Sequence, residues 1–363
     1  ARQIRSWWSD LMGKMYIKQQ IVQENPELVL SENGDFIIDK SLVDKYEIID
    51  VHCHLFKGLA HLFPAIFQKE KNNTAVSLLD KSCFPFSMDL FNLDKISYTE
   101  YPTKLLSGNG IRTRIKLFTG ALVLNYATVE RLIMDMDANG ISKAVVQQIN
   151  PPNKSCAGEM DEIVKGNSRL YTFGSIHPYD DDILSQIDIY MKMDIKGWKL
   201  NPHIWGISID DKKTIALLKE LEKTSLPIMS CSGTGLPSDV RNSNVPTKQT
   251  KKEVMTQTLA KFEKVLAYIP DATVILAHGG SFDFPYIIDI LKKYPNTYTD
   301  ISLQPSENIK QIIGEVGSDR ILFGTDYPFL NQAFSMLSVL RATTDEEERK
   351  NIFSDNAKKI LHL

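Results

Sequence analysis

Eight short apolar runs, separated by segments with helical periodicity, constrain the fold of this chain more than any other feature of its sequence. The runs lie at 46–52, 141–149, 171–176, 195–200, 226–231, 273–277, 297–302 and 320–323. Helical patterns lie between or after them, at 128–139, 180–193, 211–224, 252–268, 283–293, 306–315 and 355–362. Strands that alternate with helices are typical of repeated βα units and a parallel sheet. Eight such units predict an α/β protein with a (β/α)8 TIM barrel, whose domain typically has ~250 residues before insertions.

The rest of the chain predicts an extension and two insertions around this barrel. Residues 1–45 form the predicted N-terminal helical extension, because apolar residues in the stretch 2–22 recur at helical intervals. Residues 46–363 form the predicted barrel, with insertions at 55–127 and 232–251 that are too long for simple connections. Long loops at the catalytic face usually form lids or pocket walls, although the aromatic residues of the first insertion could equally pack a small core of their own. The extension could dock on the barrel or on a second subunit, which is compatible with a homo-oligomer.

The net charge and the cysteine content indicate which classes of partner and which cellular compartment to expect. The chain of 363 residues has a net charge of -3 and a pI near 6.2, so nothing predicts nucleic acid or an anionic membrane as a partner. No run of about eighteen apolar residues predicts a membrane span. The 4 cysteines are scattered without zinc-finger spacing, which favours a reducing compartment over a disulfide framework. We therefore expect a cytoplasmic protein that acts on a small-molecule substrate.

The pentapeptide Asp50-Val51-His52-Cys53-His54 places metal-competent side chains at two-residue spacing, at the end of the first predicted strand. In a strand, alternate side chains share a face. Asp50, His52 and His54 are therefore expected on one face, with Val51 and Cys53 on the other. Two imidazoles on the same face can share one metal ion.

Polar side chains also follow most of the other predicted strands, where TIM barrels place their chemistry. They are His177, Lys199, His203, Cys231, His278 and Asp326. Two histidines from the first strand, a further thiol or imidazole, and a carboxylate form a credible site for zinc or another borderline divalent metal. Asp326 could then accept a proton from a metal-activated water. Each residue also has a structural interpretation, because a strand-end histidine can be a hydrogen-bonded barrel residue and Asp326 can belong to a turn before Tyr327-Pro328.

Five motifs occur in order along the chain, and four of them lie at the ends of predicted strands. They are Ile49-Asp50-Val51-His52-Cys53-His54, Gly197-Trp198-Lys199-Leu200-Asn201-Pro202, Leu276-Ala277-His278-Gly279-Gly280, Leu322-Phe323-Gly324-Thr325-Asp326-Tyr327-Pro328 and the terminal Ile352-Phe353-Ser354-Asp355-Asn356-Ala357. In this combination the chain resembles the amidohydrolase superfamily. Within it, the chain is similar to the branch that includes aminocarboxymuconate-semialdehyde decarboxylase and many metal-dependent hydrolases. The resemblance covers roughly residues 46–363 and implies a metal-dependent enzyme with a TIM barrel.

The resemblance also implies roles for the candidate site residues. His52 and His54 resemble the metal ligands of the first strand, and Asp326 resembles the ligand after the eighth strand that also carries protons. His278 matches a histidine that either polarises the substrate or binds a second metal. After the fifth strand the family usually has a ligand histidine, but this chain has Cys231. A thiolate there could bind zinc, or the side chain could be an inert buried cysteine.

Lys199 leaves open how many metal ions the site holds. Some relatives with two metals carry a carboxylated lysine at this position, and it bridges the two ions. The resemblance therefore implies one divalent ion, expected to be zinc, or two ions with Cys231 and His278 serving the second. Lys199 could equally be an ordinary lysine that pairs with an acidic neighbour or binds a substrate carboxylate. His177 and His203 are candidates for contact with the substrate.

Three functions are compatible with these features. The first is a metal-dependent hydrolase, in which metal-bound hydroxide cleaves an amide, ester or lactone bond while His278 stabilises the oxyanion and Asp326 moves the proton. The second is non-oxidative decarboxylation of a small aromatic or unsaturated acid, for which the resembling branch has precedents, although Cys231 departs from the ligand set of the decarboxylases. The third is a catalytically silent barrel that binds a ligand or partner through its insertions. The fold alone does not choose among them.

Overall fold

All eight predicted strands occur, in the predicted order, in the computed structural model, which describes residues 18–59, 69–78, 122–233, 259–281 and 283–363. The strands are β3 (Ile49–His54), β4 (Lys143–Gln147), β5 (Leu170–Thr172), β6 (Trp198–Leu200), β7 (Ile228–Cys231), β8 (Val274–Ala277), β9 (Thr297–Asp300) and β10 (Ile321–Leu322). Each is parallel to its neighbours, in the orders β3-β4-β5 and β10-β9-β8-β7-β6. The periodicity of the sequence therefore predicted the strands correctly.

Hydrogen bonds join the two sheets at both seams into the ring of a (β/α)8 barrel. On one side, Gly174 bridges Trp198. A Cβ atom at Gly174 would lie 2.7 Å from the Trp198 ring, so this seam requires glycine. On the other side, Cys53 bridges Tyr327, and the N–H of Val51 donates to the carbonyl of Phe323 at 2.9 Å. The ring confirms the predicted barrel.

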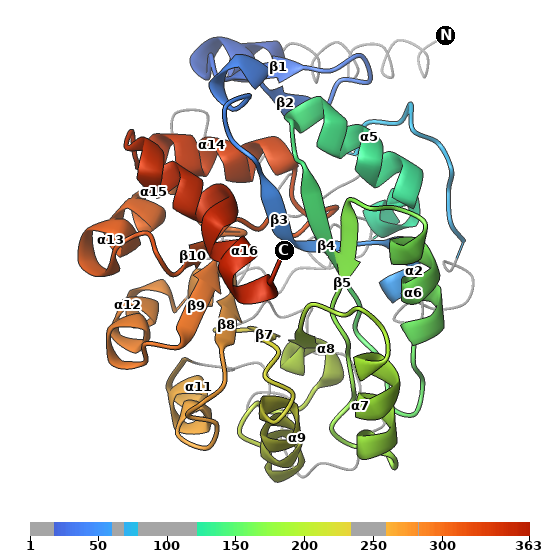
Figure 1. Ribbon diagram of the computed structural model, residues 1–363. Coiled ribbons are helices and arrows are strands. Elements are labelled where there is room, and N and C mark those ends of the chain that lie inside the picture. The colour runs from blue at the N-terminus through green and yellow to red at the C-terminus, as the bar shows by residue number, and fades with distance from the viewer. Residues whose placement is uncertain (1–17, 60–68, 79–121, 234–258, 282) are drawn as a thin grey trace, which may run out of the picture.

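Helices surround the strands, as Figure 1 shows. The principal ones are α5 (Val129–Asn139), α6 (Ala157–Lys165), α7 (Ile183–Met191), α9 (Lys212–Glu222), α11 (Leu259–Leu266), α12 (Phe284–Lys293), α13 (Ser306–Val316) and α14 (Gln332–Ala342). Helix α5 illustrates why they form. Thr128 caps its first turn by accepting from the N–H of Arg131, and Gly140 ends it with φ 71°. Leu132 and Met136, one turn apart, bury its inner side.

The barrel interior is filled by a set of buried side chains that we call the inner cluster. Its members are Ile49, Val51, Val145, Phe173, Met229, Ile275, Ala277, Tyr298, Leu322, Ala357, Ile360 and Leu361. Their neighbours along the chain, such as Ile48, Ala144 and Phe323, belong to a separate core that also contains side chains of the helices. The last three members of the inner cluster lie in or beside α16 (Asn356–Leu361), which crosses the barrel in Figure 1. This helix closes the end at which the strands begin and leaves the other end for the site.

The predicted N-terminal helical extension also contains strands. Residues 18–24 are helical, but β1 (Leu28–Leu30) and β2 (Phe36–Ile38) then form an antiparallel hairpin. The hairpin packs on α5 and α14, with Phe36 against Phe334 at 5.4 Å between ring centroids. Residues 1–17, most of the first insertion and nearly all of the second lie outside the described residues. The boundary at residue 45 and the roles of the insertions therefore stay predictions.

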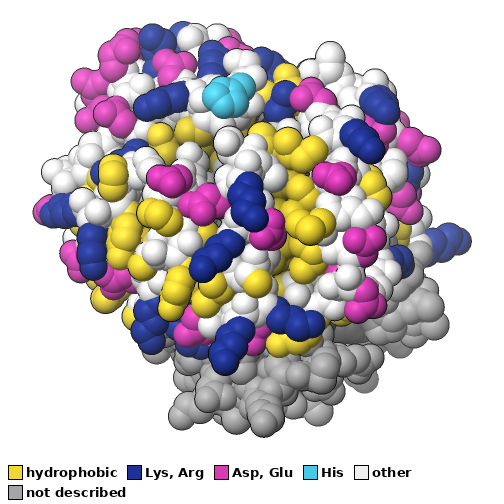
Figure 2. All heavy atoms as spheres, turned by 60° about the horizontal axis from the view of Figure 1, so that its bottom comes forward, with side chains coloured by type: hydrophobic (Ala, Val, Ile, Leu, Met, Phe, Trp, Pro, Cys, Tyr) yellow, Lys and Arg dark blue, Asp and Glu magenta, His cyan; other side chains and the backbone are white. Residues whose placement is uncertain are grey.

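On the face shown in Figure 2, acidic and basic side chains are interspersed with hydrophobic ones. Helix α7 exposes Leu184, Ile189 and Met191, with 62%, 51% and 44% of each residue accessible. Among the described residues, no helix has both the length and the apolar character that crossing a membrane requires. Assembly into a homo-oligomer stays a prediction.

Candidate metal centre

A β-bulge in β3 determines which way its two histidines point. Asp50 lies beside Ala144 and Cys53 beside Val146, so β3 has one residue more than β4 between these pairs. Val51 belongs to the inner cluster, and strict alternation from it would turn the histidines outward. The extra residue restores them to the inner side. The His52 ring lies 4.7 Å from that of His278, between ring centroids.

Asp50 was predicted to share a face with these histidines, and this prediction is wrong. Its Oδ1 accepts hydrogen bonds from the backbone N–H groups of His52 and Thr325, both at 3.0 Å, and its Oδ2 accepts from the Thr325 hydroxyl. Burial raises the pKa of Asp50 to about 7, although the Thr325 bonds oppose this shift. Asp50 therefore ties β3 to the loop that carries Asp326.

His52, His54 and Asp326 converge on one point. The Oδ1 of Asp326 lies 3.3 Å from Nε2 of His54 and 3.6 Å from Nε2 of His52, and all three residues are buried. Their ligand atoms lie within 4.8 Å of one another, close enough to bind one ion. Gly324 permits this approach, because a Cβ there would lie 3.0 Å from Cβ of His52.

Hydrogen bonds to the far nitrogens orient both imidazoles. Nδ1 of His52 lies 3.1 Å from Oδ2 of Asp300, and Nδ1 of His54 lies 3.1 Å from the carbonyl oxygen of Gln147. A proton at each Nδ1 would leave the Nε2 lone pairs available to a metal ion, as in metal sites whose histidines are held from behind.

Asp300 is the site residue that the sequence did not reveal. It ends β9 as a single carboxylate without a motif around it, and its position at a strand end is the one signal that could have found it. Burial alone would raise the pKa of Asp300, but the charge and hydrogen bond of His52, with His278 and Ser302, hold it well below its usual range. Asp300 is therefore a buried anion that holds His52.

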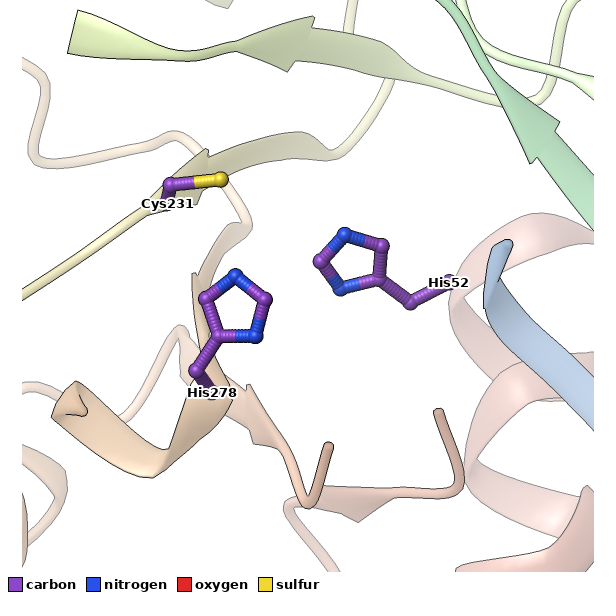
Figure 3. A group of neighbouring side chains, drawn as sticks. All are labelled: His52, Cys231 and His278. Atoms are coloured by element: carbon purple, nitrogen blue, oxygen red, sulfur yellow. The ribbon is translucent and has the colours of Figure 1, made fainter. Parts of the chain in front are cut away.

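Cys231 and His278 form a second group with His52, and the three side chains point toward one another in Figure 3. Nδ1 of His278 lies 2.8 Å from the Ser302 hydroxyl, and the Cys231 sulfur accepts from Nδ2 of Asn201 at 3.2 Å. Burial alone would lower the pKa of His278, but the hydrogen bond and charge of Cys231, with Asp326 and Asp300, raise it to about 9. The predicted inward position of Cys231 at the mouth of its strand agrees with this arrangement.

Lys199 lies inside the same chamber. Its residue pairs in register with Met229 of the inner cluster, and its Nζ lies 3.0 Å from Nε2 of His52, fully buried. Burial first and the charge of Lys199 second lower the pKa of His52 to about 3. A metal ion on His52 would therefore require Lys199 to turn aside.

The donor set suits a divalent metal. Two imidazole nitrogens, one carboxylate and one thiol are ligands for zinc and neighbouring borderline metals, and the groups behind His52 and His54 already hold their rings in position. The residues that would hold an ion form two groups, one of His52, His54 and Asp326 and one of His52, Cys231 and His278. Each is buried at the end of a barrel strand, where solvent competes weakly.

His177 and His203, the predicted substrate contacts, lie outside both ligand groups. Nε2 of His203 lies 2.9 Å from the carbonyl oxygen of Gly233. Nδ1 of His177 accepts from the N–H of Tyr179 at 3.2 Å, while its Nε2 has no partner among the described residues. Burial lowers the pKa of each to about 4, and His278 is among the groups that act on His203. Their contact with substrate stays a prediction.

Solved structures share this fold at low sequence identity. An uncharacterised TIM-barrel protein of Bordetella bronchiseptica is 19% identical, with a TM-score of 0.57, over 87% of this chain and 98% of that protein. The 5-carboxyvanillate decarboxylase of Sphingomonas paucimobilis is 14% identical, with a TM-score of 0.56, over 88% and 100%. That of Novosphingobium aromaticivorans, in complex with manganese and a nitrobenzoic acid, is 15% identical, with a TM-score of 0.54, over 88% and 97%.

Sequence comparison identifies the family. No curated protein matches the chain significantly. The model of the amidohydrolase family matches residues 49–363, which include every strand of the barrel and every candidate ligand. The chain belongs to the amidohydrolase family.

Proposed function

We propose that the protein is a metal-dependent, non-oxidative decarboxylase of a small aromatic or unsaturated carboxylic acid. Family membership already makes it a metal-dependent enzyme. The observation that carries the finer proposal is the full burial of the basic side chain of Lys199 in the same chamber as the candidate ligands. A cation in a chamber shielded from water attracts a carboxylate strongly. Solved decarboxylases of similar fold support the same reaction class.

Decarboxylation requires two things of the site: a positive charge that positions the substrate carboxylate and a group that donates one proton. The bond between the carboxylate carbon and the rest of the substrate breaks, its electron pair stays on the substrate, and a proton replaces the released carbon dioxide. Lys199 would position the carboxylate. His278, held at Nδ1 by Ser302, would deliver the proton from its other nitrogen. A divalent cation, when bound, would act as a Lewis acid on substrate oxygen atoms.

Hydrolysis, the first prediction from the sequence, is the second candidate. The observation that favours it is the position of Asp326, whose Oδ1 lies within 3.6 Å of both first-strand histidines. A carboxylate at this point could accept a proton from an attacking water. Hydrolysis gives Lys199 no comparable role, which is why we place it second.

Product analysis separates these candidates. The protein is loaded with zinc or manganese and offered hydroxybenzoates, unsaturated dicarboxylic acids, esters, lactones and amides in deuterated water. The proposal predicts equal amounts of carbon dioxide and of a product that carries deuterium at the carbon that lost its carboxylate. Cleavage of esters, lactones or amides without carbon dioxide would instead establish a hydrolase. A metal-free protein that ignores added zinc and manganese would support the silent barrel.

Matched lysine variants test the role of Lys199. Lys199→Met should abolish turnover of carboxylate substrates, because the shape is kept and the charge is lost. Lys223→Met, at a lysine whose side chain is 67% exposed, should leave turnover unchanged. Retained decarboxylation in Lys199→Met would remove the observation on which the proposal rests.

A further inference from the structure

A cavity of about 610 Å³ lies on the outer side of the barrel wall. Its walls come from the hairpin β1–β2, the segment 74–78, helix α5 and the residues that follow β10. None of the candidate metal ligands is among the described residues that line it. Small-molecule pockets usually measure ~300–1,000 Å³, so this cavity is large enough for a ring compound.

Gln332, the first residue of α14, offers an unused hydrogen-bond donor at the cavity wall. The residue is 2% exposed, and its Oε1 accepts from Nδ2 of Asn139 at 3.4 Å, which sets the orientation of the amide. Its Nε2 has no hydrogen-bond partner within the described part of the chain. A buried donor without a partner is unfavourable. Because Nε2 is itself fully buried, an oxygen atom of a bound molecule would satisfy it after the amide turns toward the cavity.

The charges around the cavity exclude anions. Carboxylates of Glu32, Asp35 and Asp135 line it, and the described lining contains no lysine, arginine or histidine. Arg131, behind the wall, already binds Asp35 at 2.6 Å and Asp135 at 2.9 Å, so neither of these two carboxylates requires a cationic ligand, and Glu32 is exposed to solvent. The remaining wall is largely apolar, with Phe36, Leu78, Met134, Pro328 and Leu330.

We propose that this cavity is a second binding site for an uncharged, mainly apolar small molecule with an oxygen acceptor for Gln332.

The cavity shares one wall segment with the metal centre. Tyr327 lines the cavity and directly follows Asp326. Its hydroxyl donates to Oδ2 of Asp135 at 3.1 Å, and its carbonyl accepts from the N–H of His54 at 2.7 Å. A molecule in the cavity would therefore touch the segment that holds Asp326, while the acidic wall would reject the carboxylate substrate proposed for the centre.

Fluorine NMR with 4-fluoroacetophenone tests the site, because this probe is uncharged and combines an apolar ring with a carbonyl oxygen. We expect saturable line broadening of the probe with the full chain. Ala138→Phe, which places a ring in the cavity from α5, should abolish this binding. Gln332→Leu should weaken it roughly 2- to 10-fold, through loss of one hydrogen bond.

Matched controls keep the test decisive. Gly314→Phe puts the same ring on the exposed side of α13, with no atom within 4 Å of its Cβ, and should leave binding unchanged. Binding that survives in a folded Ala138→Phe, or that 4-fluorobenzoate displaces, would place the probe elsewhere and overturn the proposal. If Ala138→Phe fails to fold, Gln332→Leu decides, because unchanged affinity in that variant overturns the proposal as well.

Discussion

The two ends of the barrel interior are equally buried but chemically opposite. Val51, near the strand starts, and His52, the next residue toward the strand ends, both have 0% exposure. Around Val51 the inner cluster is almost entirely apolar and closed by α16. Around His52 lie Asp300, Lys199 and His278, each within reach of another ionisable group. Burial alone therefore does not distinguish a structural from a reactive end; the difference is whether the buried side chains are apolar or are ionisable groups in contact with one another.

The largest expected effect comes from the reactive end. Asp326→Asn keeps the shape of the side chain but cannot take up a proton at neutral pH, so turnover should fall ~10²- to 10⁴-fold. Turnover, metal content and thermal melting are measured on one preparation. Asp188→Asn, at an exposed position on α7, is the control and should change none of these values. Near-normal activity in Asp326→Asn would show that Asp326 carries no proton.

The structural end should respond in stability rather than in chemistry. Leu361→Ala removes a side chain that is 2% exposed in the inner cluster, and such a cavity lowers the free energy of unfolding by about 2–5 kcal/mol. Leu184→Ala, on the exposed side of α7, should change it by less than about 0.5 kcal/mol. Denaturant unfolding measures both. If Leu361→Ala also lost its affinity for metal while folded, the two ends would not be independent.

Asp300 tests whether the groups behind the ligands matter. Asp300→Asn removes the charge that holds Nδ1 of His52, and loss of such a partner typically costs ~10- to 100-fold in metal affinity. Competition with a chelator measures the affinity. The exposed Asp319 supplies the control, since Asp319→Asn should have no effect. Equal affinities for Asp300→Asn and the unmodified chain would leave Asp300 a structural residue only.

The smallest effect is expected in the choice of metal. Replacing the thiol in Cys231→Ser substitutes a hard oxygen for a soft sulfur, so the preference for zinc over manganese should fall several-fold. Competition between the two metals, followed by element analysis, measures the ratio. An unchanged ratio would remove Cys231 from the ligand set and leave His52, His54 and Asp326 to hold the ion.

The sequence predicted those features that depend on pattern along the chain. The eight strands follow from apolar runs, and the residues after them meet at one end because parallel strands point the same way. The sequence alone therefore places six candidate residues near one another, and the structure brings them together: His52, His54, Cys231, His278, Lys199 and Asp326. Their proximity required only the topology, not the details of any side chain.

The features it missed depend on contacts across the chain. Alternation predicted Asp50 on the face of the histidines, whereas the bulge turns the histidines inward and leaves Asp50 bonded to Thr325. Asp300 has no motif, and its partner His52 lies 248 residues away. The strands of the hairpin β1–β2 have only three residues each, too few for a periodic signal. The outer cavity draws its wall from separate segments, so no local pattern could reveal it.

The bulge in β3 has a consequence for anyone who would transplant this centre into a designed barrel. On a regular strand, the two histidines would point toward the barrel interior only if the residues before them were shifted by one position. The extra residue between Asp50 and Cys53 is thus part of the graft, together with the partner loop that Asp50 anchors. A scaffold of ideal, unbulged strands could carry the same residues in its sequence, but their side chains would not point toward the metal centre.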